Sequence, residues 1–183
     1  MRALVLTAVM TATPLAADPL DLIDYAALFA ANAAAVEDVS EVRQILPVGP
    51  VTLLFDRTMT NPYTGLDESG EGAVGCFVSI LATIASAVAA CEVELPAEQL
   101  AIQTDYQSRA LDFYAANVPD ADRMTVQDRF DALIAGQIAA TRPFCANVDL
   151  VTDLADRIFT PDSAAEIDGM LSIPRLPVSN PCL

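Results

Sequence analysis

The side chains of this chain that could do chemistry are mostly carboxylates. The sequence holds 25 aspartates and glutamates, with no histidine and no lysine. Ser-His-Asp and Cys-His catalysis both need a histidine, while Schiff-base chemistry and the phosphate-binding P-loop need a lysine. Histidine-ligated metal sites are excluded for the same reason. Catalysis in this chain would therefore depend on carboxylates.

One group of carboxylates lies in a polar stretch between residues 56 and 72. Asp56, Asp67, Glu68 and Glu71 could supply the two carboxyl groups that glycoside hydrolysis needs. The run from Asp67 to Glu71 is also rich in oxygen ligands, but its spacing does not match an EF-hand calcium loop. We interpret these side chains as solvated loop carboxylates and expect no metal and no cofactor. A carboxylate-dependent hydrolase is the alternative function.

The same polar stretch holds the best candidate for a recognition site, because it mixes charged, amide and aromatic side chains. Binding residues concentrate on loops that a rigid scaffold holds in place. The predicted binding residues are Asp56, Arg57, Asn61, Tyr63, Asp67 and Glu68. A second acidic group, Asp149, Asp153 and Asp156, has helical spacing and is interpreted as a solvated helix face.

The first 17 residues have the pattern of a secretory signal peptide. Arg2 supplies the positive start, residues 3–12 are an apolar run too short to span a bilayer, and Pro14 precedes the small pair Ala16-Ala17. We predict cleavage before Asp18, a single domain over 18–183, and a periplasmic or secreted location. Loss of Arg2 would leave eight arginines against 25 acids, a net charge of −17 in place of −16. That charge opposes binding to nucleic acid or to anionic lipid.

The four cysteines of an exported chain predict two disulfide bonds. Cys76 and Cys91 fall on one expected helix, roughly 22 Å apart at the helical rise, whereas bonded cysteines have Cα atoms within about 7 Å. The expected helices 73–91 and 125–142 run parallel, because one antiparallel helix separates them. Cys91 then ends near Cys145. We therefore predict Cys91–Cys145 and, by elimination, Cys76–Cys182.

Apolar residues recur at three- and four-residue steps over most of the chain, which predicts helices. The expected helices cover 20–36, 38–46, 73–91, 96–118, 125–142, 147–159 and 160–171. Residues 51–55 (VTLLF) are the best strand candidate, but no comparable strand stands out to pair with them. They could form an extended segment packed on helices or half of a short hairpin. The predicted fold is all-α: a bundle of about six helices around a buried central helix at 73–91, with an irregular insertion at 47–72.

Residues 73–91 carry no charge, and their length also suits a transmembrane helix. The segment is rich in small residues, however, and neither flank carries a nearby arginine or lysine to orient it. A large apolar stripe beside a small-residue face is typical of a helix at the centre of a bundle. We predict a buried helix with no stable membrane insertion; a membrane-anchored accessory subunit is the alternative.

These features together predict an exported, acidic helical protein that works by binding and not by catalysis. We expect its partner to be another envelope protein and not a nucleic acid. No motif in the sequence sets its oligomeric state or the identity of the partner.

Overall fold

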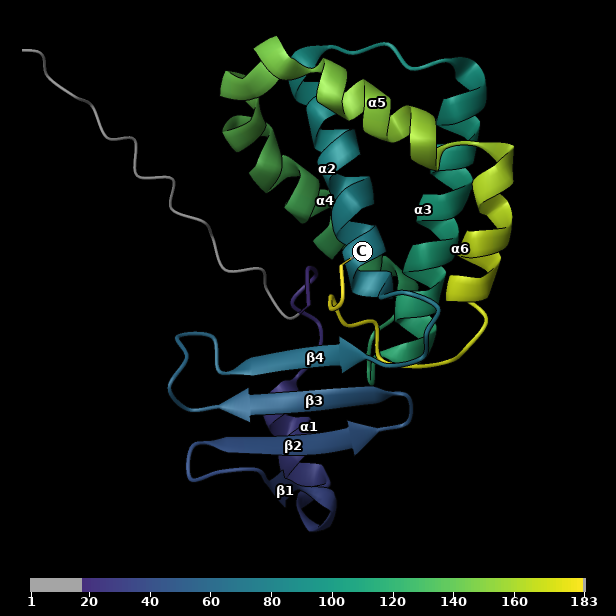
Figure 1. The fold of residues 1–183 in the computed structure, drawn as a ribbon. Coiled ribbons are helices and arrows are strands. Elements are labelled where there is room, and N and C mark those ends of the chain that lie inside the picture. Colours follow the sequence, from purple (N-terminus) through teal and green to yellow (C-terminus); the bar gives the residue numbers. More distant parts are fainter. Residues whose placement is uncertain (1–17, 183) are drawn as a thin grey trace, which may run out of the picture.

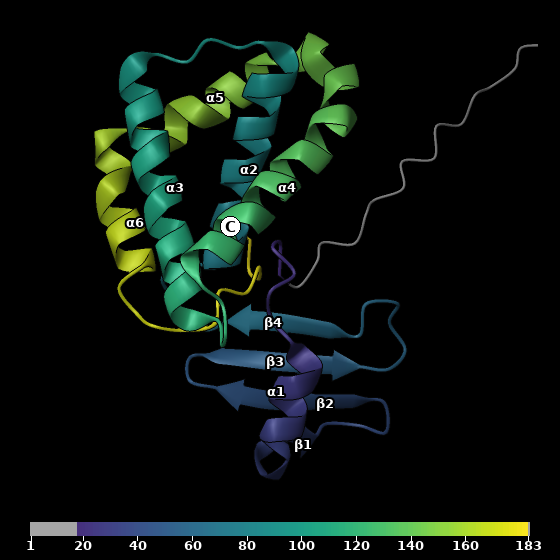
Figure 2. The same ribbon diagram turned by 180° about the vertical axis from the view of Figure 1, so that it is seen from behind.

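The computed structural model describes residues 18–182, and within that range the chain folds into six α-helices and one four-stranded antiparallel sheet. The fold is therefore mixed α/β, and the all-α prediction is wrong. Figure 1 shows helices α2 to α6 beyond the β4 edge of the sheet. Helix α1 lies across one face of the sheet, as the view from behind shows (Figure 2).

The sheet is a meander in the order β1-β2-β3-β4. Its strands are β1 Glu37–Asp38, β2 Arg43–Val48, β3 Val51–Asp56 and β4 Tyr63–Asp67. Gly49 and Pro50 form the turn between β2 and β3, where Val48 pairs with Val51. Gly49 has a φ of 59°, and a positive φ is what a tight two-residue hairpin turn requires. The Gly-Pro pair that ends the apolar run is therefore a hairpin turn.

The predicted helix at 38–46 and the irregular insertion at 47–72 are both wrong, because this region forms the sheet. The helical spacing of Val42, Ile45 and Leu46 was the misleading signal, since a short apolar run also fits a half-buried strand. Strand β4 could not be recognised from its sequence, because it contains Gly65 and glycine is a poor strand former. A Cβ at Gly65 would lie 2.2 Å from Cγ1 of Val178. The glycine is there because another segment of the chain packs directly on the strand.

Helix α1 (Tyr25–Ala31), followed by the short 3₁₀ helix Ala33–Ala35, is held on the sheet by aromatic side chains. Tyr25 stacks on Tyr63 with ring centroids 5.8 Å apart and an angle of 11° between the ring planes. Phe29 and Phe55 pack against Tyr63 with centroid distances of 5.7 and 5.1 Å. Offset aromatic contacts at these distances stabilise beyond the area they bury. The predicted helix at 20–36 is therefore correct only in its middle.

The remaining helices form the second part of the fold. They are α2 Val74–Cys91, α3 Ala97–Asn117, α4 Arg123–Thr141, α5 Asp149–Ile158 and α6 Ala164–Met170, with 3₁₀ helices at Arg142–Asn147 and Pro161–Ser163. Helix α2 packs against α3, α4 and α5. It is the one described helix long and apolar enough to cross a membrane, and 61% of it is buried within the protein. The core helix of a water-soluble protein has the same properties.

Two disulfide bonds tie the ends of α2 to later parts of the chain. Cys76 bonds Cys182 and Cys91 bonds Cys145, with Cα–Cα distances of 5.2 and 5.3 Å. These are the pairs expected from the sequence. Helices α2, α3 and α4 follow one another with short connections, so the C-terminal ends of α2 and α4 lie close enough for Cys91 to reach Cys145.

The chain after α6 returns as an extended tail that packs between the sheet and α2. The backbone N–H of Gly75 donates to the carbonyl of Val178 at 2.9 Å, and that of Asp67 donates to the carbonyl of Asn180 at 2.7 Å. Leu66 and Asn180 form a parallel bridge. The tail therefore joins the edge strand β4 to the first turn of α2.

Arg175 on this tail makes a fully buried ion pair with Asp67 at the end of β4. Its Nε donates to Oδ2 of Asp67 at 2.5 Å, and the two side chains are 0% and 1% exposed. Nη1 donates to the carbonyls of Met170 and Ile173, and Nη2 donates to the carbonyl of Gly72. The guanidinium also lies 5.6 Å from the ring centroid of Phe113 on α3.

We predict opposite effects for the same substitution at two helical glycines. A Cβ at Gly75 would lie 2.6 and 2.7 Å from the carbonyl oxygens of Pro177 and Val178. Because these are backbone atoms, Gly75→Ala should lower the free energy of unfolding by about 1–3 kcal/mol. Gly136 on α4 has no atom within 4 Å of such a Cβ. Gly136→Ala should raise the free energy of unfolding by about 0.5–1 kcal/mol. Chemical denaturation followed by circular dichroism measures both, and a stabilising Gly75→Ala would contradict the close packing of the tail.

We predict that Arg175→Met lowers the free energy of unfolding by about 3–5 kcal/mol, because it leaves the Asp67 carboxylate buried without its partner. Arg109→Met is the matched control. Arg109 pairs with Asp168, but this pair is partly exposed and so should contribute about 1 kcal/mol or less. Adding Asp67→Leu to Arg175→Met should restore much of the loss. Equal effects of the two arginine substitutions would show that the buried pair has no special role.

Candidate functional site

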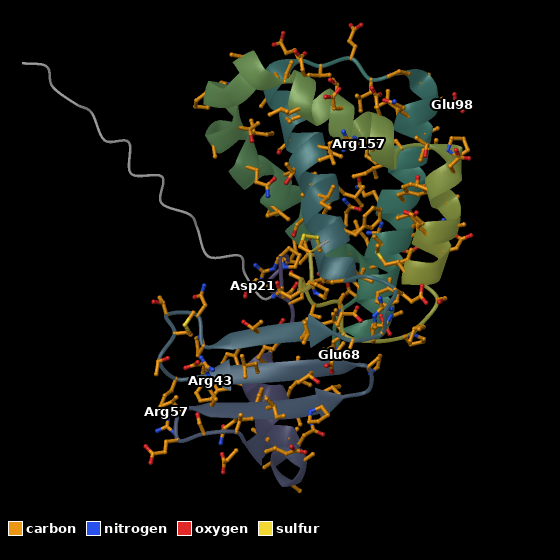
Figure 3. All side chains as sticks on the ribbon, in the orientation of Figure 1. Asp21, Arg43, Arg57, Glu68, Glu98 and Arg157 are labelled. Atoms are coloured by element: carbon orange, nitrogen blue, oxygen red, sulfur yellow. A yellow bond between two sulfur atoms is a disulfide. The ribbon has the colours of Figure 1, made fainter. Side chains whose placement is uncertain are left out.

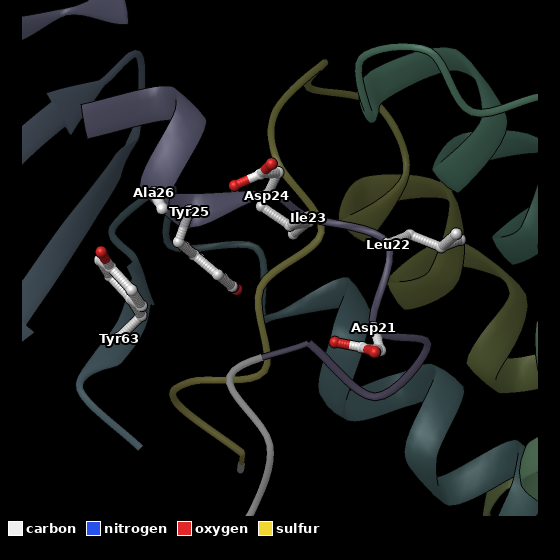
Figure 4. Close-up of a pocket in the computed structure, with 7 residues that line it drawn as sticks. All are labelled: Asp21, Leu22, Ile23, Asp24, Tyr25, Ala26 and Tyr63. Atoms are coloured by element: carbon white, nitrogen blue, oxygen red, sulfur yellow. The ribbon is translucent and has the colours of Figure 1, made fainter. Parts of the chain in front are cut away.

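A cleft opens where the segment before α1 meets β4 (Figure 4). Its main part has a volume of about 420 Å³, and an adjoining hollow adds about 220 Å³. We call the two together the α1–β4 cleft. The lining residues are Asp18, Asp21, Leu22, Ile23, Asp24, Tyr25, Ala26, Asn61, Pro62 and Tyr63. The volume falls in the range of small-ligand sites in proteins.

Hydrogen bonds to Asp18 fix the conformation of the segment that forms one wall of this cleft. Its carboxylate accepts hydrogen bonds from the backbone N–H groups of Leu20, Leu22 and Ile23, at 3.0, 2.5 and 2.8 Å. The resulting turn places Asp21 in the left-handed region, with a φ of 52°. Aspartate tolerates this region better than most residues because its short side chain can bond locally. Asp24 then caps α1, with Oδ1 accepting from the N–H of Ala27 at 2.8 Å.

Beneath the cleft, Asp18 belongs to a buried polar cluster with Tyr114 of α3. The Tyr114 hydroxyl lies 2.9 Å from the carbonyl oxygen of Pro177 and 3.3 Å from Oδ1 of Asp18, and can donate its proton to one of them at a time. Burial raises the pKa of Asp18, and the three backbone N–H groups and the Tyr114 hydroxyl oppose that rise. Burial, followed by the charge of Asp18, raises the pKa of Tyr114 well above its ordinary value.

The Tyr25 hydroxyl is the polar group of the cleft wall that lacks a partner. Tyr25 is 9% exposed, and its hydroxyl makes no hydrogen bond within residues 18–182. Burial, followed by the nearby charge of Asp18, raises the pKa of Tyr25, so the hydroxyl keeps its proton. Figure 4 shows the Asp21 carboxylate turned toward the side of the cleft where the Tyr25 hydroxyl ends. Buried polar groups in native structures are nearly all paired, so this hydroxyl needs an explanation.

The structure brings two of the six predicted binding residues to this cleft, Asn61 and Tyr63. Asp56 instead closes a turn at the end of β3, accepting from Arg43 Nε at 2.6 Å and from the Thr58 hydroxyl at 2.6 Å. Arg57 lies in the exposed loop after β3. Glu68 accepts a hydrogen bond from the Thr52 hydroxyl at the other end of the sheet, as the labels in Figure 3 show. Asp67 is buried with Arg175. The predicted site is therefore divided over the sheet.

Sequence reasoning missed Asp18, Asp21 and Tyr25. Asp21 and Tyr25 both fall within the helix predicted at 20–36, and Asp18 is only the expected first residue of the mature chain. The Asp18-Pro19 pair did not indicate the turn, because an aspartate followed by a proline also suits the start of a helix. The stacking of Tyr25 on Tyr63 joins residues far apart in the chain, and no local pattern indicates it.

A second cleft of about 610 Å³ lies between α3 and the region of α6. Its charged side chains are already paired, because Arg109 bonds Asp168 and Asp112 accepts from Arg123 Nε at 2.7 Å. Within residues 18–182 no three histidine, cysteine, aspartate or glutamate side chains are grouped in a way that could hold a metal ion. The α1–β4 cleft is therefore the candidate site.

Comparison with known proteins adds no information about function: no protein-family model, no curated protein and no solved structure matches this chain.

We predict that Tyr25→Phe raises the free energy of unfolding by about 1–3 kcal/mol, because it removes a buried hydroxyl that has no partner. Tyr114→Phe is the matched control. It removes a hydroxyl that is hydrogen-bonded and should lower the free energy of unfolding by about 1 kcal/mol. Urea denaturation followed by circular dichroism measures both changes. A destabilising Tyr25→Phe would mean that the hydroxyl has a partner in the folded protein.

We predict that Asp56 makes stability depend on acid pH. Hydrogen bonds from the Thr58 side chain, followed by Arg43, lower the pKa of Asp56 to about 2. A carboxyl group whose pKa is lower in the folded than in the unfolded protein stabilises the folded state. This contribution is complete at pH values above the unfolded pKa of about 4. This contribution is lost as the pH falls from 4 through 2. The difference in melting temperature between the wild type and Asp56→Asn should therefore shrink over that interval, and a difference that does not change with pH would refute the assignment.

Proposed function

We propose that this chain is an exported, non-enzymatic binding protein of the cell envelope that recognises its ligand in the α1–β4 cleft. The observation that carries the proposal is the buried Tyr25 hydroxyl without a partner at the cleft wall. An unpaired buried polar group costs free energy in the unliganded protein. A ligand that hydrogen-bonds this hydroxyl would remove that cost. The stacking of Tyr25 on Tyr63 holds the hydroxyl in place.

Export is supported by the cysteines. The two disulfide bonds fit an oxidising environment outside the cytoplasm. The proposed signal peptide, residues 1–17, lies outside the described residues. We propose that the mature protein is a single domain that begins at Asp18 and resides in the periplasm or is secreted. Mass spectrometry of the exported protein tests the start, and an intact segment 1–17 would refute it.

Binding is better supported than the two alternatives. A hydrolase would need a carboxylate pair, but three of the four predicted candidates are each engaged by a different partner: Asp56 by Arg43, Asp67 by Arg175 and Glu68 by Thr52. A membrane-anchored subunit would use α2 as its span, but α2 packs against three other helices and is tied by disulfides at both ends. We expect the mature protein in the soluble fraction without detergent; recovery only from carbonate-washed membranes would support the span.

We predict that added bulk in the cleft abolishes ligand binding. Ala26 is exposed and lines the cleft, whereas its neighbour Ala27 is exposed outside the lining. Ala26→Gln should therefore block a ligand, and Ala27→Gln should not, while both retain the helix because glutamine is a good helix former. Fractions of envelope extract are added to the ¹⁵N-labelled mature protein, and chemical shifts are compared between wild type and both variants.

The proposal requires shifts around Asp21 and Tyr63 that persist in Ala27→Gln and disappear in Ala26→Gln. Shifts confined to the α3–α6 cleft, or shifts that survive in Ala26→Gln, would overturn it. The same fractions are assayed for turnover, and hydrolysis abolished by Asp21→Asn would show that the site is catalytic.

A further inference from the structure

The charge of the α1–β4 cleft limits what it can bind. Its lining holds three aspartates and no arginine. The whole chain carries a net charge of −16 and contains no lysine that could reach into the cleft. Because a negative electrostatic potential repels anions and attracts cations, the cleft favours a positively charged ligand.

Of the three aspartates, Asp21 is the one whose carboxylate is available to a ligand. Asp18 is buried and already accepts three backbone N–H groups. Asp24 caps α1 through its Oδ1. Asp21 is exposed, and within residues 18–182 its side chain takes part in none of the hydrogen bonds or ion pairs. A ligand cation can therefore use Asp21 as its counter-ion.

The Tyr25 hydroxyl is a second, independent sign of a ligand. It is buried, has no partner among the described residues, and belongs to a side chain that lines both parts of the cleft. A hydroxyl oxygen has two lone pairs that can accept hydrogen bonds. A cation that carries N–H groups can therefore bond Asp21 and this oxygen together.

The chemistry of the walls favours an organic cation over a metal ion. Calcium takes six to eight oxygen ligands, and within residues 18–182 no three acidic side chains are grouped to hold a metal. Leu22, Ile23 and Pro62 instead give the cleft an apolar wall. The rings of Tyr25 and Tyr63 lie in the same lining, and aromatic rings attract cations.

We propose that the α1–β4 cleft binds a primary alkylammonium group. Asp21 is its counter-ion, the Tyr25 hydroxyl oxygen accepts one of its N–H groups, and the apolar wall holds the alkyl chain. This inference rests on the binding function proposed above. A quaternary ammonium has no N–H to donate, and a guanidinium presents five donors in a planar fork, more than these two acceptors can satisfy.

Calorimetric titration of the mature, disulfide-bonded protein tests the ligand class. The probes are 1,5-diaminopentane, a lysine residue blocked at both backbone ends, and tetramethylammonium. Saturable binding of the first two, with no binding of tetramethylammonium, is the expected result. Tighter binding of the diamine assigns the natural ammonium to a small amine, and tighter binding of the blocked lysine assigns it to a lysine of a partner protein. Equal binding of tetramethylammonium would overturn the hydrogen-bonded arrangement.

Asp21→Asn should weaken amine binding about tenfold or more, as expected for the loss of a charged hydrogen-bond partner. Asp120→Asn is a closely matched control. Asp120 also has a left-handed backbone, with a φ of 60° against 52° for Asp21, and it lies outside the cleft. Asparagine tolerates this backbone, so both variants should fold. Equal weakening by the two substitutions would mean that only the net charge of the protein matters.

Tyr25→Phe should weaken amine binding about tenfold, although the same change stabilises the unliganded protein. Unchanged amine binding by Tyr25→Phe would show that the hydroxyl is not part of the site.

The two proposals can fail separately. If Ala26→Gln blocks an envelope ligand but no amine binds, the ammonium inference is wrong and the binding function stands. If Ala26→Gln blocks nothing, the binding function is wrong as well.

Discussion

The buried pair of Arg175 and Asp67 is the interaction on which the rest of the structure depends. A buried ion pair is tolerated only when its remaining donors and acceptors are satisfied. Here the carbonyls of Gly72, Met170 and Ile173 accept from the guanidinium, and Asp67 Oδ1 accepts from the N–H of Ser69. These partners come from the loop between β4 and α2, from the last residue of α6 and from the segment after it. One side chain therefore fixes the sheet against the helices.

The tail that carries Arg175 also positions the candidate site. Beyond Arg175 it packs on Gly65 of β4 and Gly75 of α2, where no larger residue fits without a shift in the structure. The carbonyl of Pro177 lies within hydrogen-bonding distance of the Tyr114 hydroxyl, which also lies beside Asp18. Asp18 in turn shapes the segment that forms the cleft wall. A continuous set of contacts thus runs from the C-terminal tail to the cleft, and the Cys76–Cys182 bond anchors its end.

The buried ion pair of the core and the Tyr25 hydroxyl of the cleft wall differ in how fully they are hydrogen-bonded. Arg175 and Asp67 are almost fully buried in the core, and each has several hydrogen-bond partners. At the cleft wall, the Tyr25 hydroxyl is buried without a partner, although phenylalanine would preserve the ring stack on Tyr63. Functional sites are where a folded protein departs from the most stable arrangement. The unpaired hydroxyl, and not the size of the cleft, separates it from the cleft of similar volume at α3 and α6.

The sequence by itself determined the features that depend on local spacing and composition. The positions of α2, α3 and α4 follow from apolar periodicity, and the two disulfide pairs follow from the order of these helices. The absence of histidine and lysine excluded most catalytic chemistry. Only the tertiary structure decided the sheet and the site. Strand β4 contains Gly65, which makes sense only with Val178 packed against it, and Tyr25 meets Tyr63 only because α1 lies on the sheet. Both depend on contacts between residues distant in sequence, and short-range periodicity carries no information about such contacts.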